Sequence, residues 1–151
     1  MTIDLSKRRD AADLVDSIWE ARRAERRDLL PQLLPLLQHE VPTVREEVIS
    51  LVFVKWREIS ARDRLERVLR EDTDPGVRAS AVGALAILSE PASRQRDIAM
   101  LRDVVLDRRE AEEIRKAAYE GLTMLLHGHT SLIDDATDLD EDMDIDWVKS
   151  L

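Results

Sequence analysis

The chain of 151 residues has no cysteine, few aromatic residues and no long apolar run. Without cysteine, neither disulfide bonds nor thiolate metal sites can form. Three Trp, one Tyr and one Phe leave the core to aliphatic side chains, which is typical of packed helices. No apolar stretch approaches the ~20 residues of a membrane-spanning helix, and the first ten residues are too polar for an export signal. We therefore expect a soluble, cytoplasmic protein with one folded domain.

The folded body also lacks a net positive charge. The formal net charge at pH 7 is −9, of which −7 lies in residues 131–151 and only −2 in residues 1–130. Proteins that bind nucleic acid usually show a clear positive footprint, so the charge disfavours DNA or RNA as a partner. An acidic tail also opposes contact with anionic membranes. The charge balance favours a protein partner, one with a basic surface.

Apolar residues recur at spacings of three and four along most of the body, which is the pattern of amphipathic helices. Asp74 and Pro75 mark the clearest helix start, because Asp can cap the first turn and Pro is preorganised for its first position. The pattern predicts an all-α fold with helices over residues 10–25, 29–40, 42–59, 60–70, 75–88, 91–107 and 111–126. We expect the first to cap the array and the second to be kinked at Pro35. The spacing places Trp19 and Trp56 in packing between helices.

A repeat emerges when the second helix of each pair is compared. Val44-Arg45, Val77-Arg78 and Ile114-Arg115 stand 33 and 37 residues apart, each in the first turn of a predicted helix. Further apolar residues follow at four and eight positions after each pair. Self-similarity at this period predicts helix pairs stacked into a solenoid, in which each pair buries a face that its neighbour needs.

These motifs resemble HEAT-repeat proteins over residues 29–126. The leucine-rich segment around Pro35, the turn, and the Val44-Arg45 pair fit the family pattern, and the stretch from Asp72 to Leu88 fits it best. Val41 and Ala111 replace the turn Asp in the first and last repeats. The resemblance implies a short right-handed α-α superhelix over residues 1–130, including the N-terminal capping helix. It also implies that the Arg of the second helix bonds an acid of the turn.

The acidic tail, residues 131–151, allows two interpretations. It interleaves seven Asp and one Glu with large apolar residues, among them Trp147. One interpretation is a disordered extension or a capping helix docked on the last repeat. The other is a recognition segment in which Trp147 anchors while the Asp row meets a basic partner.

The residues that carry catalytic chemistry are sparse. His39-Glu40 is similar to the His-Glu pairs of deoxyhypusine hydroxylase, but the chain has one such pair. His127 and His129 lie near a helix end without a matching carboxylate pattern, so solvent-exposed histidines are favoured over a metal site. No nucleophile triad, phosphate loop or paired-carboxylate motif occurs. We expect no enzyme activity, cofactor or metal.

Arginine clusters allow an alternative function. Most of them are interpreted as solvated helix faces paired with nearby acids, as at Arg62 with Glu66 and Arg67 with Glu71. Alternatively they form a basic stripe on a DNA-binding or DNA-repair solenoid, since alkylpurine DNA glycosylases resemble HEAT solenoids. The clusters are Arg22, Arg23, Arg26 and Arg27; Arg62, Arg64, Arg67 and Arg70; Arg94, Arg96 and Arg102; and Arg108 and Arg109.

The sequence as a whole favours a non-enzymatic protein-interaction module. In a helical solenoid the second helices line a concave face that varies without disturbing the core. An adaptor, a scaffold or an inhibitor would fit, and a bacterial immunity protein that neutralises a basic toxin domain is one concrete hypothesis. The predicted partner-binding residues are Arg45, Arg78, Lys116, Glu120, Asp140, Asp142, Asp144, Asp146 and Trp147.

Overall fold

The computed structural model describes residues 4–5, 10–128 and 143–151, and every regular element among them is helical. Short 3-10 segments (η2, η3 and η5) and one π-helical segment (η4) join the α-helices. In chain order the elements are α1 (Ala11–Arg23), η2 (Arg27–Leu29), α2 (Leu30–Leu33), η3 (Leu34–Gln38), α3 (Pro42–Ile49), η4 (Ser50–Lys55), η5 (Ile59–Ala61), α4 (Arg62–Glu71), α5 (Pro75–Ile87), α6 (Arg94–Leu106), α7 (Glu112–His127) and α9 (Ile145–Ser150).

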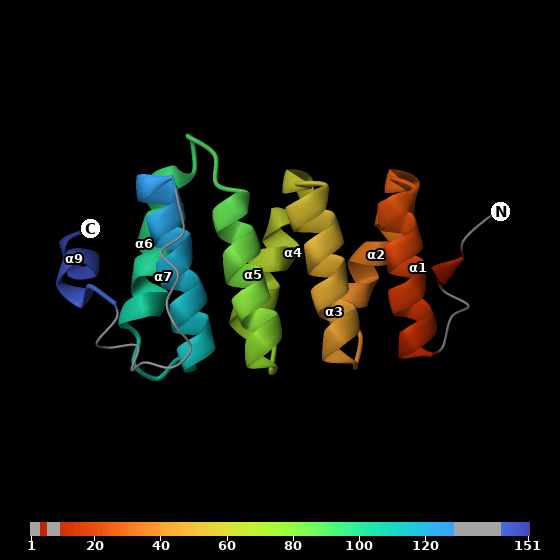
Figure 1. Ribbon diagram of the computed structural model, residues 1–151, viewed down its shortest axis with the longest axis horizontal. Helices are drawn as coiled ribbons and strands as arrows, with labels where there is room; N and C mark the ends of the chain where they lie inside the picture. Colours follow the sequence, from red (N-terminus) through yellow and green to blue (C-terminus); the bar gives the residue numbers. More distant parts are fainter. Residues whose placement is uncertain (1–3, 6–9, 129–142) are drawn as a thin grey trace.

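The helices form two layers (Figure 1). α1, α3, α5 and α7 stand side by side, run in the same direction and each pack on the next, and we call them the second-helix layer. α2 with η3, α4 and α6 lie behind them as the first-helix layer, where each packs mainly on the second helix of its own pair. The all-α prediction is confirmed. The right-handed twist of the α-α superhelix stays a prediction.

Helix α5 forms as its sequence predicts. The Asp74 carboxylate accepts a hydrogen bond from the Val77 backbone N–H at 3.0 Å, and Pro75 occupies the first turn, where it has no hydrogen bond to lose. Ala81 and Ala84 are almost fully buried. Small side chains at these positions allow α3 and α7 to approach α5 from both sides.

Two segments depart from straight α-helices. The predicted kink at Pro35 takes the form of a change from α2 to the 3-10 segment η3 at Leu34, with Pro35 in its first turn. The helix predicted to reach residue 59 instead widens into η4 and ends at Trp56, whose N–H donates to the Leu51 carbonyl at 2.9 Å. Arg57 then turns the chain with φ of 54°.

One continuous apolar core runs between the layers, and it includes Trp56, which is 4% exposed. Trp19 is different: it is 43% exposed, and the Arg22 guanidinium lies 4.9 Å from its ring centroid. The expectation that Trp19 packs between helices is therefore wrong. Leu14 and Ile18 occupy the inner face of α1, and Trp19 lies about 100° further around the helix than Ile18.

The end of the chain lies against the last helix pair. α9 packs on α6, and Val148 and Met143 are buried there. The Trp147 ring meets the Tyr119 ring edge to face at 5.8 Å and lies 5.4 Å from the His127 ring. Among residues 143–151, the structure thus has the arrangement of a capping helix. Residues 131–142 of the acidic tail lie outside the described residues.

Candidate partner-binding faces

The first arginine of the repeat, Arg45, is buried at the junction between two helix pairs. Its guanidinium donates to both carboxylate oxygens of Asp72 at 2.8 Å, and to the backbone carbonyls of His39 and Glu40 at 2.7 and 3.2 Å. Arg45 is 7% exposed. Because Asp72 belongs to the turn between α4 and α5, the ion pair ties α3 to the following repeat. The guanidinium of Arg45 is therefore bonded within the protein, and little of its surface is accessible to a partner.

The equivalent arginines of the next repeats occupy the same place. Arg78 pairs with Glu110 of the following turn at 2.5 and 3.1 Å, and its Nε donates to the Leu69 carbonyl at 2.7 Å. Arg115 is buried and donates to the Val105 carbonyl at 2.9 Å. We call these three arginines the arginine ladder. The resemblance to HEAT repeats implies that each bonds an acid of the turn, and Arg45 and Arg78 do so with the turn of the next repeat, where Glu110 supplies the acid beside Ala111.

The remaining predicted contact residues are divided between α7 and the tail. Lys116 and Glu120 lie half-buried on α7. Asp144 caps α9 by accepting from the Trp147 N–H at 2.8 Å, and Asp146 is exposed with Lys149 at 3.9 Å. Trp147 is committed to the ring contacts described above. Asp140 and Asp142 lie outside the described residues.

Three carboxylates near the starts of successive second helices form a feature that we call the acidic edge: Glu46 of α3, Asp74 before α5 and Glu113 of α7. Partial burial raises the pKa of Glu46, and the negative charges of Asp74, Glu47 and Glu113 raise it further, while Arg45 lowers it. The charges of Asp74, Glu47 and Glu113 thus act on Glu46 in one direction, against the charge of Arg45. Glu46 and Glu113 were not among the contact residues predicted from the sequence, because the interaction of their charges depends on how the helix pairs stack.

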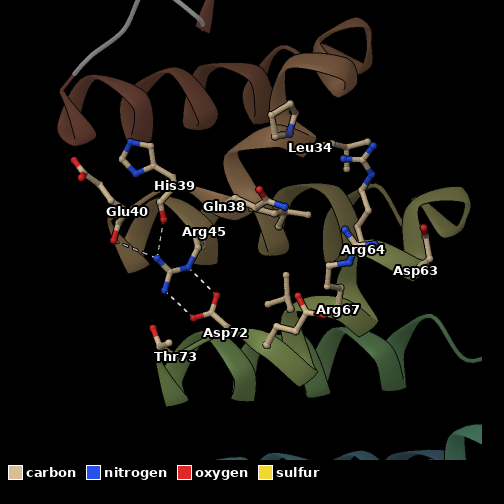
Figure 2. Close-up of a pocket in the computed structure, with 14 residues that line it drawn as sticks. Leu34, Gln38, His39, Glu40, Arg45, Asp63, Arg64, Arg67, Asp72 and Thr73 are labelled. Atoms are coloured by element: carbon tan, nitrogen blue, oxygen red, sulfur yellow. Dashed lines mark hydrogen bonds and ion pairs between the residues drawn. The ribbon is translucent and has the colours of Figure 1, made fainter.

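The first-helix layer is hollowed between its helices. A hollow of about 840 Å³ lies between η3 and α4 (Figure 2). Arg64 and Arg67 extend from α4 toward η3, while the Arg45–Asp72 pair closes the opposite end. A second hollow of about 670 Å³ lies between α4 and α6 and is lined by Arg70. Sequence reasoning did not predict either hollow, because both result from the spacing between helices that are not consecutive.

Most other arginines bond inside the protein. Arg62 pairs with Glu66 at 3.0 Å, as the helical spacing predicts, and with Asp97 at 2.5 Å. Asp97 is completely buried, and it also accepts from the Ser93 hydroxyl at 2.7 Å. This buried pair joins α4 to α6, and no sequence pattern indicates it, because its two residues lie 35 positions apart in the chain. The predicted pair of Arg67 with Glu71 does not form among the described residues.

Two of the histidines that the sequence singled out as possible metal ligands make other contacts. In the part of the chain that the structure describes, no three His, Asp or Glu side chains gather as a metal-ligand set. His39 accepts from the Val41 N–H at 3.1 Å through Nδ1, and the ring of His127 lies on Trp147. Among the same residues, no helix combines the length and apolar character needed to cross a bilayer.

Comparison with known proteins agrees with the repeat architecture. A family model for HEAT repeats matches residues 30–123, which is more than half of the chain. HEAT repeats generally mediate protein–protein interactions and typically form non-catalytic scaffolds. No curated protein and no solved structure matches the chain. With its stacked helix pairs, its arginine ladder and this match, the chain belongs to the HEAT-repeat family.

Proposed function

We propose that this chain is a non-enzymatic interaction module that binds a protein with a basic surface through its second-helix layer. The acidic edge carries the proposal. Glu46, Asp74 and Glu113 project from three different helix pairs, so a single basic partner would meet all three repeats. Complementary charge of this kind sets the orientation of a partner and speeds its association.

The pKa of Glu46 supports this proposal. A raised carboxyl pKa reports burial and negative potential that the protein itself does not neutralise. A lysine or arginine side chain of a partner would lower that potential, and its binding would favour the ionised form of Glu46. We therefore expect binding of a basic ligand to strengthen as the pH rises through the pKa of Glu46.

The predicted contact residues take different parts in this proposal. Arg45 and Arg78 position the helices beneath the surface, through the bonds described above. Lys116, Glu120 and Asp146 extend the contact, and Asp144 and Trp147 hold α9 against the last repeat at its border. Asp140 and Asp142 stay predicted contacts of the acidic tail.

One specific form of this function is a bacterial immunity protein that neutralises a basic toxin domain. A small acidic scaffold can cover a cationic active surface and hold it by charge and shape. Adaptors and assembly scaffolds use the same chemistry, and the identity of a partner recovered from the native host separates them.

The acidic edge is tested with a fluorescein-labelled peptide of alternating Lys and Ala, by fluorescence anisotropy at several salt concentrations. The variant Glu46→Gln with Glu113→Gln is expected to bind about tenfold more weakly, because each exposed charge contact contributes up to ~1 kcal/mol. The control variant Glu90→Gln with Asp103→Asn removes two exposed charges elsewhere and is expected to bind like the wild type.

Equal losses in both variants would show that only net charge matters and would contradict the proposal. Tight, salt-sensitive binding of duplex DNA, unaffected by Glu46→Gln with Glu113→Gln, would replace the proposal with the DNA-binding alternative.

A further inference from the structure

A group of three arginines lies on the exposed side of α4. Within the described residues, Arg64, Arg67 and Arg70 make neither an ion pair nor a hydrogen bond. All three are exposed and follow one another at intervals of three residues. We call them the α4 arginine row. In contrast, Arg62 on the same helix is held by Glu66 and Asp97.

The α4 arginine row faces the two hollows of the first-helix layer. Arg64 and Arg67 line the hollow between η3 and α4, which has Leu34, Leu37 and Val68 among its other walls (Figure 2). Arg70 lines the hollow between α4 and α6, where Leu69, Met100 and Val104 supply the apolar surface. Both hollows thus combine an apolar wall with at least one arginine that has no bonded partner within the described residues, and both also contain carboxylates, such as Asp63 in the first and Asp103 in the second.

This combination fits a ligand that is both acidic and apolar. A guanidinium binds a carboxylate through two parallel hydrogen bonds. Removing the apolar wall from water lowers the free energy of the complex. We propose that the first-helix layer binds an acidic peptide segment of a partner protein. Carboxylates of the peptide pair with Arg64 and Arg67, and its apolar side chains enter the hollow between η3 and α4.

A peptide fits the charges around the hollow better than a nucleic acid does. Glu40, Asp63 and Glu71 line the same hollow and are exposed, so separate negative charges stand beside Arg64 and Arg67. A continuous polyphosphate would be repelled by these carboxylates. A peptide places its acidic residues at intervals and can leave apolar or neutral residues opposite Asp63 and Glu71. The residues that line this hollow include no tryptophan, tyrosine or phenylalanine on which bases could stack.

The size of the hollow agrees with a few peptide side chains. Pockets that hold small ligands measure about 300–1,000 Å³, and the hollow between η3 and α4 measures about 840 Å³. This surface lies on the first-helix layer, whereas the acidic edge belongs to the second-helix layer. Binding of an acidic peptide at this hollow is therefore independent of the binding proposed for the acidic edge.

The test measures the binding of a fluorescein-labelled peptide of alternating Asp and Leu by fluorescence anisotropy. The variant Arg64→Gln with Arg67→Gln is expected to weaken binding about tenfold. As a matched control, Arg23→Gln with Lys55→Gln removes two exposed positive charges near the ends of α1 and η4 and is expected to leave the affinity within about twofold. Peptides with Asn for Asp, or Ser for Leu, are each expected to bind about tenfold more weakly than the parent peptide.

Circular dichroism and urea unfolding establish that each variant retains the fold. Two results would overturn the inference: equal weakening by the α4 variant and its control, or equal binding of the Asp and Asn peptides. A labelled single-stranded DNA that outcompetes the acidic peptide at the same salt concentration, and that loses affinity in Arg64→Gln with Arg67→Gln, would assign the α4 arginine row to nucleic acid and would also overturn it.

Discussion

The two junctions between successive helix pairs are built differently. At the first junction, between α3 and α5, the Arg45–Asp72 pair is almost completely buried, with side chains 9% and 7% exposed. At the second, between α5 and α7, the equivalent Arg78–Glu110 pair is 23% and 19% exposed. There the close approach of the helices contributes more: a Cβ added to Gly121 would lie 3.0 Å from the Ala86 Cβ.

A single position of the repeat accounts for part of this difference. Leu51, Ala84 and Gly121 each stand seven residues after the apolar residue of the Val-Arg or Ile-Arg pair, and all three are buried. The side chain at this position becomes smaller along the array. The smaller side chain lets α7 approach its neighbours closely, whereas the first junction depends more on the bonds of Arg45. One repeat pattern thus supports two kinds of junction.

The largest expected effect comes from breaking the buried pair of the first junction. Arg45→Ala leaves the Asp72 carboxylate buried without its partner and frees the carbonyls of His39 and Glu40. We expect the free energy of unfolding to fall by about 3–5 kcal/mol, measured by urea denaturation followed by circular dichroism. Arg78→Ala, the matched change at the second junction, is expected to cost about 1–2 kcal/mol. Equal losses would mean that the two junctions do not differ as described.

The second junction is tested by adding a methyl group where the helices approach most closely. Gly121→Ala is expected to lower the free energy of unfolding by about 1–3 kcal/mol, because the new Cβ would lie 3.0 Å from the Ala86 Cβ and 3.3 Å from the Leu101 Cδ1, so that α5 and α6 would have to give way. Gly83→Ala is the matched control: a Cβ there meets no atom within 4 Å, so stability is expected to rise by about 0.5–1 kcal/mol. Thermal melting of both variants checks this, and a more stable Gly121→Ala protein would contradict it.

The contact of α9 with the last helix pair extends the comparison beyond the two junctions. Val148→Ala is expected to destabilise the protein by about 1–2 kcal/mol, because Val148 of α9 is fully buried where this helix packs on α6. Lys149→Ala on the same helix changes an exposed residue and is expected to stay within about 0.5 kcal/mol of the wild type. Urea unfolding distinguishes them. If Val148→Ala behaves like Lys149→Ala, α9 does not stabilise the last helix pair in solution.

The smallest effect is expected at the acidic edge, beside the first junction. The folded state raises the pKa of Glu46 above its ordinary value of 4.5, so the folded protein holds this proton more tightly than the unfolded chain. Glu46 therefore favours folding when it is protonated, and this contribution is lost as the pH rises through its folded pKa. Glu46→Gln is expected to be more stable than the wild type at pH 7, by less than about 0.5 kcal/mol because solvent screens the site.

Melting temperatures of Glu46→Gln and the wild type, measured from pH 4 to pH 8, check this prediction. The two curves are expected to converge toward acid pH. A constant difference across the range would show that the gain does not come from ionisation.

The repeat architecture was predictable because local signals repeat. The pairs at Val44-Arg45, Val77-Arg78 and Ile114-Arg115 identify equivalent positions, and Asp74 with Pro75 marks a helix start that the structure confirms. What periodicity cannot supply is the partner of each residue. The resemblance to HEAT repeats implies that Arg45 bonds a turn acid, but only the stacking of the pairs shows that Asp72 of the next repeat is that acid.

The candidate surfaces were less predictable for the same reason. Arg62 and Arg67 occupy similar sequence contexts four residues before an acid, yet Arg62 is held in the interior by Asp97 of α6 while Arg67 faces a hollow. The partner lies 35 positions away in the chain. Likewise, Trp19 adjoins the buried Ile18, and a small rotation about the helix axis determines whether such a side chain is buried or exposed.

The common direction of α1, α3, α5 and α7 gives the second-helix layer an electrical polarity, which α4 and α6 oppose because they run the other way. Within this layer the peptide dipoles align, so their positive ends gather where these helices start and their negative ends where they stop. Charged side chains oppose the potentials of both ends. The carboxylates of the acidic edge stand at the starts of these helices, and three arginines donate to carbonyls at the ends: Arg27, Arg57 and Arg94. A charged partner approaching through solution would turn the molecule before touching it, so its orientation would be selected during diffusion.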